Sequence, residues 1–522
     1  MLTPEFLALS AAIVPDRLAT LFEGRARTYA ELQERVQRLA TALARLGVGP
    51  GDRVATLQVN SDALVEAYFA TALLDAIYVP LNFRAKADEL TSMVNNAEPV
   101  VLLVGGRYGE LVRGIAPGLR SVRHYVALEG EAPGWPSYEA LVQGAEPEER
   151  APAAGEEATT LLMYTAGTTG RPKAAMLTHA SFSSYVLANV SPADPEEDEE
   201  RNLLSVPLYH IAGMQAVIAG VYGGRTLVLQ RQFEPREWME LVQRYRAQRA
   251  MMVPTMLKQL LEHPDFRRYD LASLRVITYG AASMPLEVIR RALAELPGVR
   301  FINAFGQTET ASTITMLPPE DHVLEGSPEE VERKLKRLTS IGRPLEDVEV
   351  RVVDEEGREV PPGVVGEIVA RGPRIMKGYW RLEEATSQTL RGGWLYTGDL
   401  AYRDEDGYLY LAGRAKDTIK RGGELIATEE VERVLQEHPA VADAAVIGVP
   451  DAHWGERVRA VVVLREGHRA TEADLIEHCR QRLASYKKPE SVVFVAELPR
   501  NPLGKVLKRE LRERFGQPIE AR

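Results

Sequence analysis

The residues best suited to chemistry form one short stretch, LLMYTAGTTGRPKAAML, at positions 161–177. Its four apolar or aromatic residues predict a short buried strand, and threonines, glycines and a lysine follow. Glycines let the backbone approach a ligand closely, and threonine hydroxyls, free backbone N–H groups and a lysine can bind phosphate oxygens. We therefore interpret the stretch as a polyphosphate-binding loop whose candidate residues are Thr165, Gly167, Thr168, Thr169, Gly170 and Lys173.

Two better-known phosphate motifs are absent from this loop. It lacks the G-x-x-x-x-G-K-[ST] spacing of a Walker A loop and the G-x-G-x-x-G spacing of a dinucleotide site. The alternative is a surface turn rich in small polar residues. The length of the run and its Arg-Pro-Lys end favour the phosphate interpretation.

Composition limits the class of protein. The 522 residues correspond to about three domain-sized units, and a content of 45% apolar and 26% charged residues is typical of a globular protein with a large core. The net charge of −11 argues against a nucleic-acid partner. The single cysteine, Cys479, excludes an intrachain disulfide and a thiolate metal cluster, and we expect it to be a packed side chain.

The chain shows no sign of a membrane or export segment. No Lys or Arg precedes the apolar stretch FLALSAAIV near the N-terminus, whereas Glu5 does, which disfavours a signal peptide. No apolar run approaches the ~20 residues of a membrane span. We expect a cytoplasmic protein without an integral membrane segment.

The elements that must position the loop alternate between strands and helices. Thr28 and Glu31 have the spacing of a capping box and begin a predicted amphipathic helix at 28–47. The alternation that follows predicts crossover units and a parallel sheet. Further predicted strands lie at 202–210 and 249–257, and strand–turn–helix units begin at 274 and 299. Since ligands bind at the carboxyl ends of parallel strands, one crevice could collect residues 161–177, 205–210, 278–284 and 303–309.

The last third of the chain has a different sequence pattern. From about residue 341, alternating β-branched residues and turn signals such as Pro361-Pro362-Gly363 predict antiparallel hairpins. After Lys416 a small α+β unit is predicted, with helices at 429–437 and 472–483 and strands at 441–448, 457–464 and 491–497.

Five motifs, in this order along the chain, carry a resemblance to a known family. They are the loop at 161–177, FGQTE at 305–309, YTGDL at 396–400, GRAKDTIKRGGE at 413–424 and PLGK at 502–505. Together they resemble the acyl-adenylate-forming superfamily. PLYH at 207–210 and VIGVPDAHWGE at 446–456 look most like its fatty-acid and aryl-acid CoA ligases.

The resemblance implies a fold, a reaction and a set of ligands. The expected fold is α/β, with a large N-terminal domain (1–412) of layered α/β subdomains plus a β-barrel-like unit. A hinge (413–419) and a small mobile α+β domain (420–522) follow. A carboxylic acid and ATP would give acyl-AMP and pyrophosphate, and the thiol of coenzyme A would then displace AMP. ATP, Mg²⁺ and coenzyme A are thus the expected cofactors.

The resemblance also implies residue roles. Thr308 would contact the α-phosphate, and Glu309 would hold Mg²⁺, which prefers a few carboxylates plus substrate oxygens. Asp399 would accept the ribose hydroxyls, with Arg414 near the ribose or phosphates. The adenine would pack on Phe305 and be flanked by Asn303 and Ala304.

Lys505 is the expected catalytic lysine of the C-terminal domain. Pro499, Pro502 and Gly504 predict a loop that reaches away from its domain. By resemblance, Lys505 would bridge the carboxylate and the α-phosphate during adenylation. Rotation at Lys416 would then withdraw it and bring Gly422 and Gly423 to a pantetheine tunnel. Ala166, Ala174 and Leu425 depart from the family's usual residues, which leaves ATP affinity and tunnel geometry in question.

The sequence defines the substrate acid less closely than it defines the reaction. His210 stands where amino-acid-activating relatives carry an Asp, which disfavours an α-amino acid, and Gly306 stands where acetate-activating relatives carry a Trp. The expected acyl pocket comprises His210, Gly280, Ala281, Ala282 and Gly306. We expect a medium- or long-chain fatty or alicyclic acid. An aryl acid, a carrier-protein acceptor and a luciferase-like oxygenase remain alternatives, and a homodimer is left open.

Overall fold

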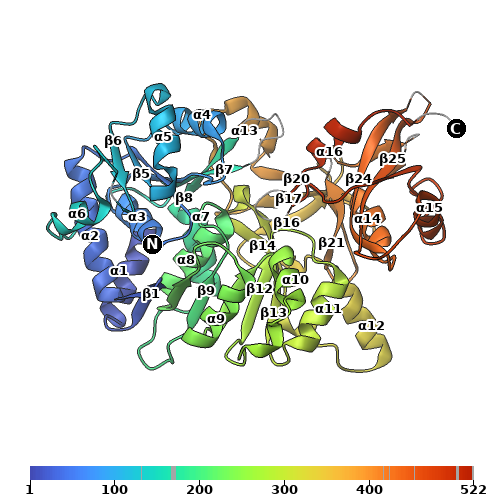
Figure 1. Cartoon of the computed structure of the whole chain (residues 1–522), viewed down its shortest axis with the longest axis horizontal. Helices are drawn as coiled ribbons and strands as arrows, with labels where there is room; N and C mark the ends of the chain where they lie inside the picture. The colour runs from blue at the N-terminus through green and yellow to red at the C-terminus, as the bar shows by residue number, and fades with distance from the viewer. Residues whose placement is uncertain are drawn as a thin grey trace.

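The computed structural model describes residues 1–130, 132–165, 172–414, 417–421, 424–451, 453–500 and 505–519. A broad body of α/β layers makes up most of the molecule, and α14, α15, α16, β24 and β25 gather in a smaller unit at one end (Figure 1). Within the described ranges, no helix is long and apolar enough to cross a membrane.

The first sheet of the large body contains the strand that enters the predicted phosphate loop. Its strand order is β18-β8-β7-β4-β3-β5-β6, and β4, β3, β5 and β6 are parallel, as the alternation predicts. The strands are β3 (Arg53–Leu57), β4 (Ile77–Pro80), β5 (Val101–Val104), β6 (His124–Ala127), β7 (Thr159–Thr165), β8 (Lys173–Thr178) and β18 (Gly378–Tyr379). Helices of the large body include α2 (Tyr29–Arg45), α3 (Asp62–Leu73), α4 (Ala87–Ala97), α5 (Gly109–Ile115), α6 (Tyr138–Gln143) and α13 (Glu383–Thr389).

The second sheet has nine strands in the order β15-β14-β13-β12-β11-β9-β10-β1-β2. They are β1 (Leu18–Phe22), β2 (Arg25–Thr28), β9 (Arg201–Leu204), β10 (Thr226–Leu229), β11 (Arg249–Met252), β12 (Val276–Gly280), β13 (Arg300–Gln307), β14 (Ser312–Leu317) and β15 (Arg343–Pro344). Further helices of the large body are α1 (Thr3–Ile13), α7 (His179–Asn189), α8 (Ile211–Tyr222), α9 (Pro235–Tyr245), α10 (Pro254–Glu262), α11 (Leu286–Glu295) and α12 (Pro328–Arg337), of which α7 contacts β8 of the seven-stranded sheet.

A third, antiparallel sheet forms the barrel-like unit. Its strands are β16 (Glu349–Val353), β17 (Gly366–Arg371), β19 (Leu390–Arg391), β20 (Trp394–Arg403) and β21 (Leu409–Arg414). The hairpin signals after residue 341 predict this arrangement.

The C-terminal unit is α+β, as predicted. Its sheet contains β22 (Ile419–Arg421), β23 (Glu424–Ile426), β24 (Val441–Asp451), β25 (Gly455–Leu464) and β26 (Ser491–Phe494). Its helices are α14 (Thr428–Gln436), α15 (Glu472–Arg480) and α16 (Lys508–Phe515). Cys479 is buried on α15, as expected for a packing residue.

The predicted helix at 28–47 shows how local sequence sets an element. The Thr28 side chain accepts a hydrogen bond from Glu31 N at 3.2 Å, and Thr28 N donates to Glu31 Oε2 at 2.8 Å. This reciprocal capping box satisfies two otherwise orphaned N–H groups at the start of α2. The apolar face is buried through Leu32, Val36, Leu39 and Leu43.

Two predicted strands are wrong in length. The expected strand at 249–257 ends at Met252, because Pro254 takes the first position of α10, where its missing N–H has no cost. The expected strand at 202–210 ends at Leu204, and its remaining residues lead into α8, whose N-cap is His210.

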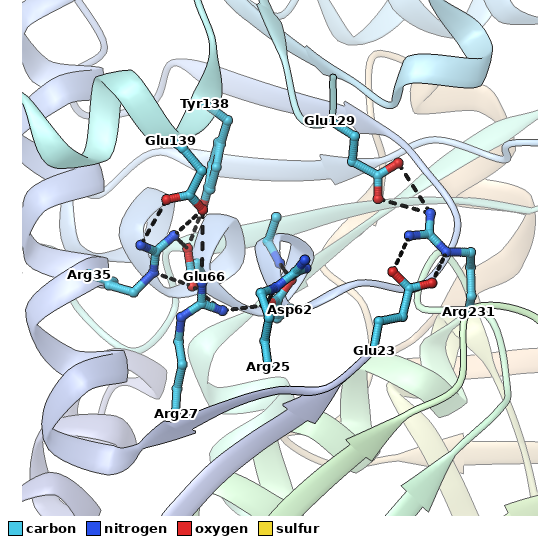
Figure 2. Close-up of polar contacts among 11 residues, drawn as sticks. Glu23, Arg25, Arg27, Arg35, Asp62, Glu66, Glu129, Tyr138, Glu139 and Arg231 are labelled. Carbon is cyan, nitrogen blue, oxygen red and sulfur yellow. Dashed lines mark hydrogen bonds and ion pairs between the residues drawn. The ribbon is translucent and has the colours of Figure 1, made fainter. Parts of the chain in front are cut away.

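A buried carboxylate network holds the N-terminal layer together (Figure 2). Glu66 on α3 is fully buried and accepts hydrogen bonds from Arg35 Nε at 2.7 Å and Tyr138 Oη at 2.6 Å. Arg27 lies 3.5 Å from the same carboxylate and also contacts Asp62. Because a buried charge is costly unless it is paired, these partners tie β2, α2 and α6 to α3.

A second ion-pair cluster joins the two large sheets (Figure 2). Arg231, after β10, lies 2.7 Å from Glu23 in the β1–β2 turn and 2.9 Å from Glu129, which follows β6. Arg231 therefore links the edge of the nine-stranded sheet to the seven-stranded one.

Candidate active site

The predicted phosphate loop is flanked by the antiparallel strands β7 and β8. Thr165 pairs with Lys173 across them, and the Thr165 hydroxyl donates to the Lys173 carbonyl at 3.4 Å. Both side chains are half-buried. The remaining loop candidates, Gly167, Thr168, Thr169 and Gly170, lie outside the described residues.

Lys173 and Glu309 converge on Tyr379. The Tyr379 hydroxyl donates to Glu309 Oε1 at 2.8 Å, and Lys173 Nζ lies 5.2 Å from the centroid of the Tyr379 ring. Tyr379 belongs to β18, which pairs with β8 two residues after Lys173. Segments far apart in the sequence thus bring a cation and a carboxylate to one aromatic side chain, a neighbour that the sequence analysis does not identify.

The segment that carries Thr308 and Glu309 has a fixed and unusual backbone. It forms a single 3₁₀ turn, Thr308–Thr310, followed by Ala311 and Ser312 with φ of 47° and 93°. The Glu309 carbonyl accepts from Met376 N at 2.9 Å. Left-handed conformations at non-glycine residues are strained, and the roles of Thr308 and Glu309 beside them stay predictions.

Gln307 connects this turn to the YTGDL motif. Its Nε2 donates to Asp399 Oδ2 and to the Thr397 carbonyl, both at 2.9 Å. Asp399 N donates to the Thr397 hydroxyl at 3.1 Å, and the Asp399 residue is only 6% exposed. A buried carboxylate with these fixed partners can accept hydroxyl donors from a ligand. Gln307 lies inside a recognised motif, but its role depends on a residue 92 positions away.

The three candidate adenine residues lie on β13. Phe305 is half-buried at the edge of the barrel cluster that contains Ile314 and Ile341. Ala304 pairs with Gly280 on the parallel strand β12. Asn303 is buried, and its side-chain amide donates to the Ser340 carbonyl at 3.0 Å, so one of its N–H groups is already engaged.

Gly280 and Gly306 are required by close backbone packing. A Cβ on Gly280 would lie 2.1 Å from the Ala304 carbonyl oxygen, and a Cβ on Gly306 would lie 1.6 Å from that of Ser312. Both glycines therefore permit close packing between neighbouring strands, and the role of Gly306 in leaving room for the acid stays a prediction. Ala281, with φ of 66°, turns the chain at the end of β12, and Ala282 after it is half-buried.

His210 is the N-cap of α8 and a neutral group. Burial lowers the pKa of His210 to about 3, with a smaller contribution from Arg84. Its ring lies 4.1 Å from that of Tyr209, and its Nε2 is buried without a hydrogen-bond partner in the described structure. Neutral imidazole cannot replace a carboxylate as the partner of a substrate ammonium, which is the reason an α-amino acid is disfavoured.

Lys505 is exposed, and the described residues before and after it are joined by backbone contacts. Arg500 and Val506 form a β-bridge, and Leu507 N donates to the Pro499 carbonyl at 2.8 Å. Arg512 on α16 lies 2.8 Å from Asp417, which links the helix after Lys505 to the expected hinge. Arg414 pairs with Asp399 through the backbone of β21. Lys416, Gly422 and Gly423 lie outside the described residues.

The donor set of the site fits Mg²⁺ held together with substrate phosphates. Tyr379 occupies Glu309 Oε1, whereas Oε2 accepts no hydrogen bond from a described residue. No group of three or more potential metal-ligating side chains occurs in the described ranges. One carboxylate plus phosphate oxygens and water is an arrangement that Mg²⁺ accepts.

Comparisons with known proteins define the class. Residues 7–380 match the AMP-binding enzyme family, and residues 430–505 match the AMP-binding enzyme C-terminal domain. The chain therefore belongs to the AMP-binding enzyme superfamily. It lies in the acyl-CoA ligase branch and is an AMP-forming acid–thiol ligase.

Two curated relatives and one solved structure illustrate the range of acids in this branch. The chain is 39% identical to a feruloyl-CoA synthase from Amycolatopsis sp., with 97% of each chain covered. It is 37% identical to a long-chain-fatty-acid–CoA ligase from Thermus thermophilus, with 98% of this chain and 95% of that one covered. The anthranilate CoA ligase AuaEII in complex with anthranoyl-AMP superposes with a TM-score of 0.88 at 27% identity, covering 98% of this chain and 97% of that one. This similarity confirms the predicted fold class.

Proposed function

We propose that this enzyme activates a carboxylic acid larger than acetate as its adenylate and transfers the acyl group to coenzyme A. The observation that carries the proposal is the convergence of Lys173 and Glu309 on Tyr379, beside a turn that Gln307 ties to Asp399. In this proposal Lys173 is the cation for phosphate oxygens, Glu309 is the carboxylate for Mg²⁺, and Asp399 is the buried acceptor for ribose.

The chemistry at this site is positioning and charge stabilisation. The acid's carboxylate attacks the α-phosphorus of ATP, and pyrophosphate leaves. Lys173 and Thr308 hold the phosphate oxygens, on which charge changes during the reaction, and Asp399 orients the ribose. Fixed donors and bound geometry of this kind supply most of the rate enhancement in phosphoryl-type transfers. Mg²⁺ on Glu309 would supply further neutralisation of phosphate charge.

The C-terminal unit serves both half-reactions in turn. Lys505 bridges the carboxylate and α-phosphate in the first, and rotation at Lys416 replaces it with the segment around Gly422 and Gly423 in the second. Support comes from the ion pair between Arg512 and Asp417, which ties the helix after Lys505 to the expected hinge. Conformational steps of this type let one site present two different environments.

The decisive experiment is pyrophosphate release across a panel of acids, with and without coenzyme A. The panel runs from acetate to palmitate and includes benzoate, cinnamate and cyclohexylpropanoate. Release that requires ATP and an acid, with thioester and AMP formed only when coenzyme A is added, supports the proposal. Thioester formed on a holo-carrier protein but not on coenzyme A would instead identify a carrier-loading enzyme.

A further inference from the structure

A buried ion pair joins α16 to α14 in the smaller unit at one end of the molecule (Figure 1). Lys508 Nζ lies 2.7 Å from Glu432 Oε1 and donates a hydrogen bond to Thr428 Oγ1 at 2.6 Å. The Lys508 side chain is 11% exposed and that of Glu432 is 16% exposed. Glu432 Oε1 also accepts from Val446 N of β24 at 2.7 Å. One carboxylate therefore connects the first residue of α16 to α14 and to the central hairpin of the unit.

Stability alone gives a weak reason for such a pair. Two charges lose their hydration when they are buried, and their mutual attraction often only balances this cost. Apolar side chains of similar volume frequently stabilise a fold as well as a buried ion pair or better. Charge-assisted hydrogen bonds differ from apolar contacts in their defined geometry. The pair is therefore best suited to hold α16 at one particular place on α14.

The pair lies only three residues after Lys505. Three residues span at most ~11 Å of chain, so the place of Lys508 limits the place of Lys505. Both residues between them are also held by backbone contacts, Val506 by a β-bridge to Arg500 and Leu507 by a hydrogen bond from its N–H to an upstream carbonyl at 2.8 Å. The backbone on the C-terminal side of Lys505 is thus fixed as far as the buried pair.

A second contact fixes the same face of α16. Arg512, one turn after Lys508, lies 2.8 Å from Asp417 beside the expected hinge, and residues at i and i+4 share a helix face. Arg509 and Arg514 instead pair with glutamates of α16 itself and are largely exposed. Lys508 and Arg512 therefore link the helix to other elements, whereas the other two cations do not contribute to its placement.

We propose that Lys508 and Glu432 are positioning residues for Lys505, because their ion pair sets where the start of α16 presents that lysine to the acid and the α-phosphate. This inference rests on the proposed function, which gives Lys505 its role in adenylate formation. It goes beyond that function by assigning the side chains that place Lys505. Since a displacement of about 1 Å at a reacting group costs ~100-fold in rate, a contact remote from the chemistry can govern the first half-reaction.

A neutral pair of nearly equal volume tests the inference. Lys508→Met combined with Glu432→Gln removes both charges and keeps an amide oxygen for Val446 N. Acyl-AMP formation in a single turnover should slow by ~10-fold or more, with the KM values for ATP and acid close to those of wild type. Thioester formation from supplied acyl-AMP and coenzyme A should keep its wild-type rate, because Lys505 serves only the first half-reaction.

A conservative variant and a matched pair provide the controls. Lys508→Arg keeps a cation opposite Glu432 and should form the adenylate faster than the neutral double variant. Lys487, which follows α15, lies 2.7 Å from Glu430 on α14, but this partly exposed pair does not involve α16. Lys487→Met combined with Glu430→Gln should therefore leave the rate of adenylate formation unchanged.

Thermal unfolding separates positioning from a merely structural role. The neutral double variant should unfold close to the wild-type temperature, since a neutral pair often replaces a buried ion pair without loss of stability, and its two half-reactions should still differ. If the double variant does not fold at the assay temperature, Thr428→Val removes one partner of Lys508 at constant volume, and a smaller loss confined to adenylate formation is expected. In whichever variant folds, wild-type rates of both half-reactions, or an equal loss in both, overturn the inference.

The outcomes also separate this inference from the proposed function. Wild-type adenylate formation in the neutral double variant, together with its loss in Lys505→Ala, overturns the positioning role and leaves the proposed function intact. Failure of every acid to release pyrophosphate with the wild-type enzyme overturns the proposed function, and with it the basis of the inference.

Discussion

Tyr379 donates a hydrogen bond to Glu309 Oε1 at 2.8 Å while Lys173 lies over its ring. The hydroxyl fixes one carboxylate oxygen, and no described residue donates a hydrogen bond to the other. The ring provides an apolar, electron-rich face that orients the lysine ammonium. Tyr379 thereby contacts both charged groups that we propose for the ATP phosphates and Mg²⁺.

Replacing Tyr379 by Phe should retain the ring and remove only the hydroxyl. Loss of a hydrogen bond to a charged group costs about 1.5–3 kcal/mol; we therefore expect kcat/KM for ATP to fall by ~10–100-fold, with a higher Mg²⁺ concentration needed for half-maximal rate. Pyrophosphate release measured against Mg²⁺ checks this. Tyr269→Phe, which removes a hydroxyl that contacts the Glu240 carboxylate instead, should behave like wild type. An unchanged Mg²⁺ requirement in Tyr379→Phe would contradict the role of Tyr379.

Replacing the buried Asp399 should affect the KM for ATP and not the KM for the acid. Asp399→Asn keeps the side-chain shape but removes the charge of the carboxylate. Because we propose that the ribose hydroxyls donate to this carboxylate, as Gln307 does, the KM for ATP should rise ~10–100-fold. Gln307→Leu should show a smaller change in the same direction. Initial rates at varied ATP and varied acid separate the two constants, with Gln388→Leu on the exposed face of α13 as the control. An equal rise in both KM values would indicate a general structural defect.

Lys505→Ala should separate the two half-reactions. Removing the bridging cation is expected to reduce adenylate formation by ~100-fold or more, whereas thioester formation from supplied acyl-AMP and coenzyme A should be largely retained. Arg509→Ala, on the exposed face of α16, controls for disturbance of the helix. Equal loss of both half-reactions would reject the two-conformation interpretation.

The overall organisation of the fold was predictable from sequence, because capping, turn and periodicity signals are local. Thr28 and Glu31 define the start of α2, and alternation defines the parallel strands. The boundary between β11 and α10 was wrong because the apolar run continues through Pro254, where a helix begins. Lys173, Glu309 and Asp399 could be named from motifs, but Tyr379 could not, since only the pairing of β18 with β8 brings it to them.

Buried neutral histidines should make the enzyme less stable below neutral pH. Burial lowers the pKa of His179 to about 4, and its Nδ1 accepts a hydrogen bond from Thr3 N at 3.3 Å. Protonation therefore favours the unfolded chain. The stabilisation that neutral His179 gives the folded protein is complete above about pH 6.5 and is lost as the pH falls toward 4. Between pH 7 and pH 5 the loss from His179 should be about 2 kcal/mol.

Urea unfolding at pH 7 and pH 5 measures this contribution. In His179→Gln the decrease in unfolding free energy from pH 7 to pH 5 should be smaller than in wild type by about 2 kcal/mol. His468→Gln, at an exposed position, should leave the decrease unchanged. An identical pH dependence in wild type and His179→Gln would show that His179 does not remain neutral in the folded protein.

Glu66 should be essential for stability although it lies away from the catalytic site. Its removal in Glu66→Leu leaves Arg35, Arg27 and the Tyr138 hydroxyl without their shared acceptor (Figure 2). Breaking a buried ion pair by removing one partner costs about 3–5 kcal/mol. In contrast, Glu34→Ala removes an exposed pair with Arg38, worth less than about 1 kcal/mol. The free energy of unfolding measured in urea should therefore fall several times more in Glu66→Leu than in Glu34→Ala. A similar small loss in both variants would mean that the network contributes no more than a surface pair.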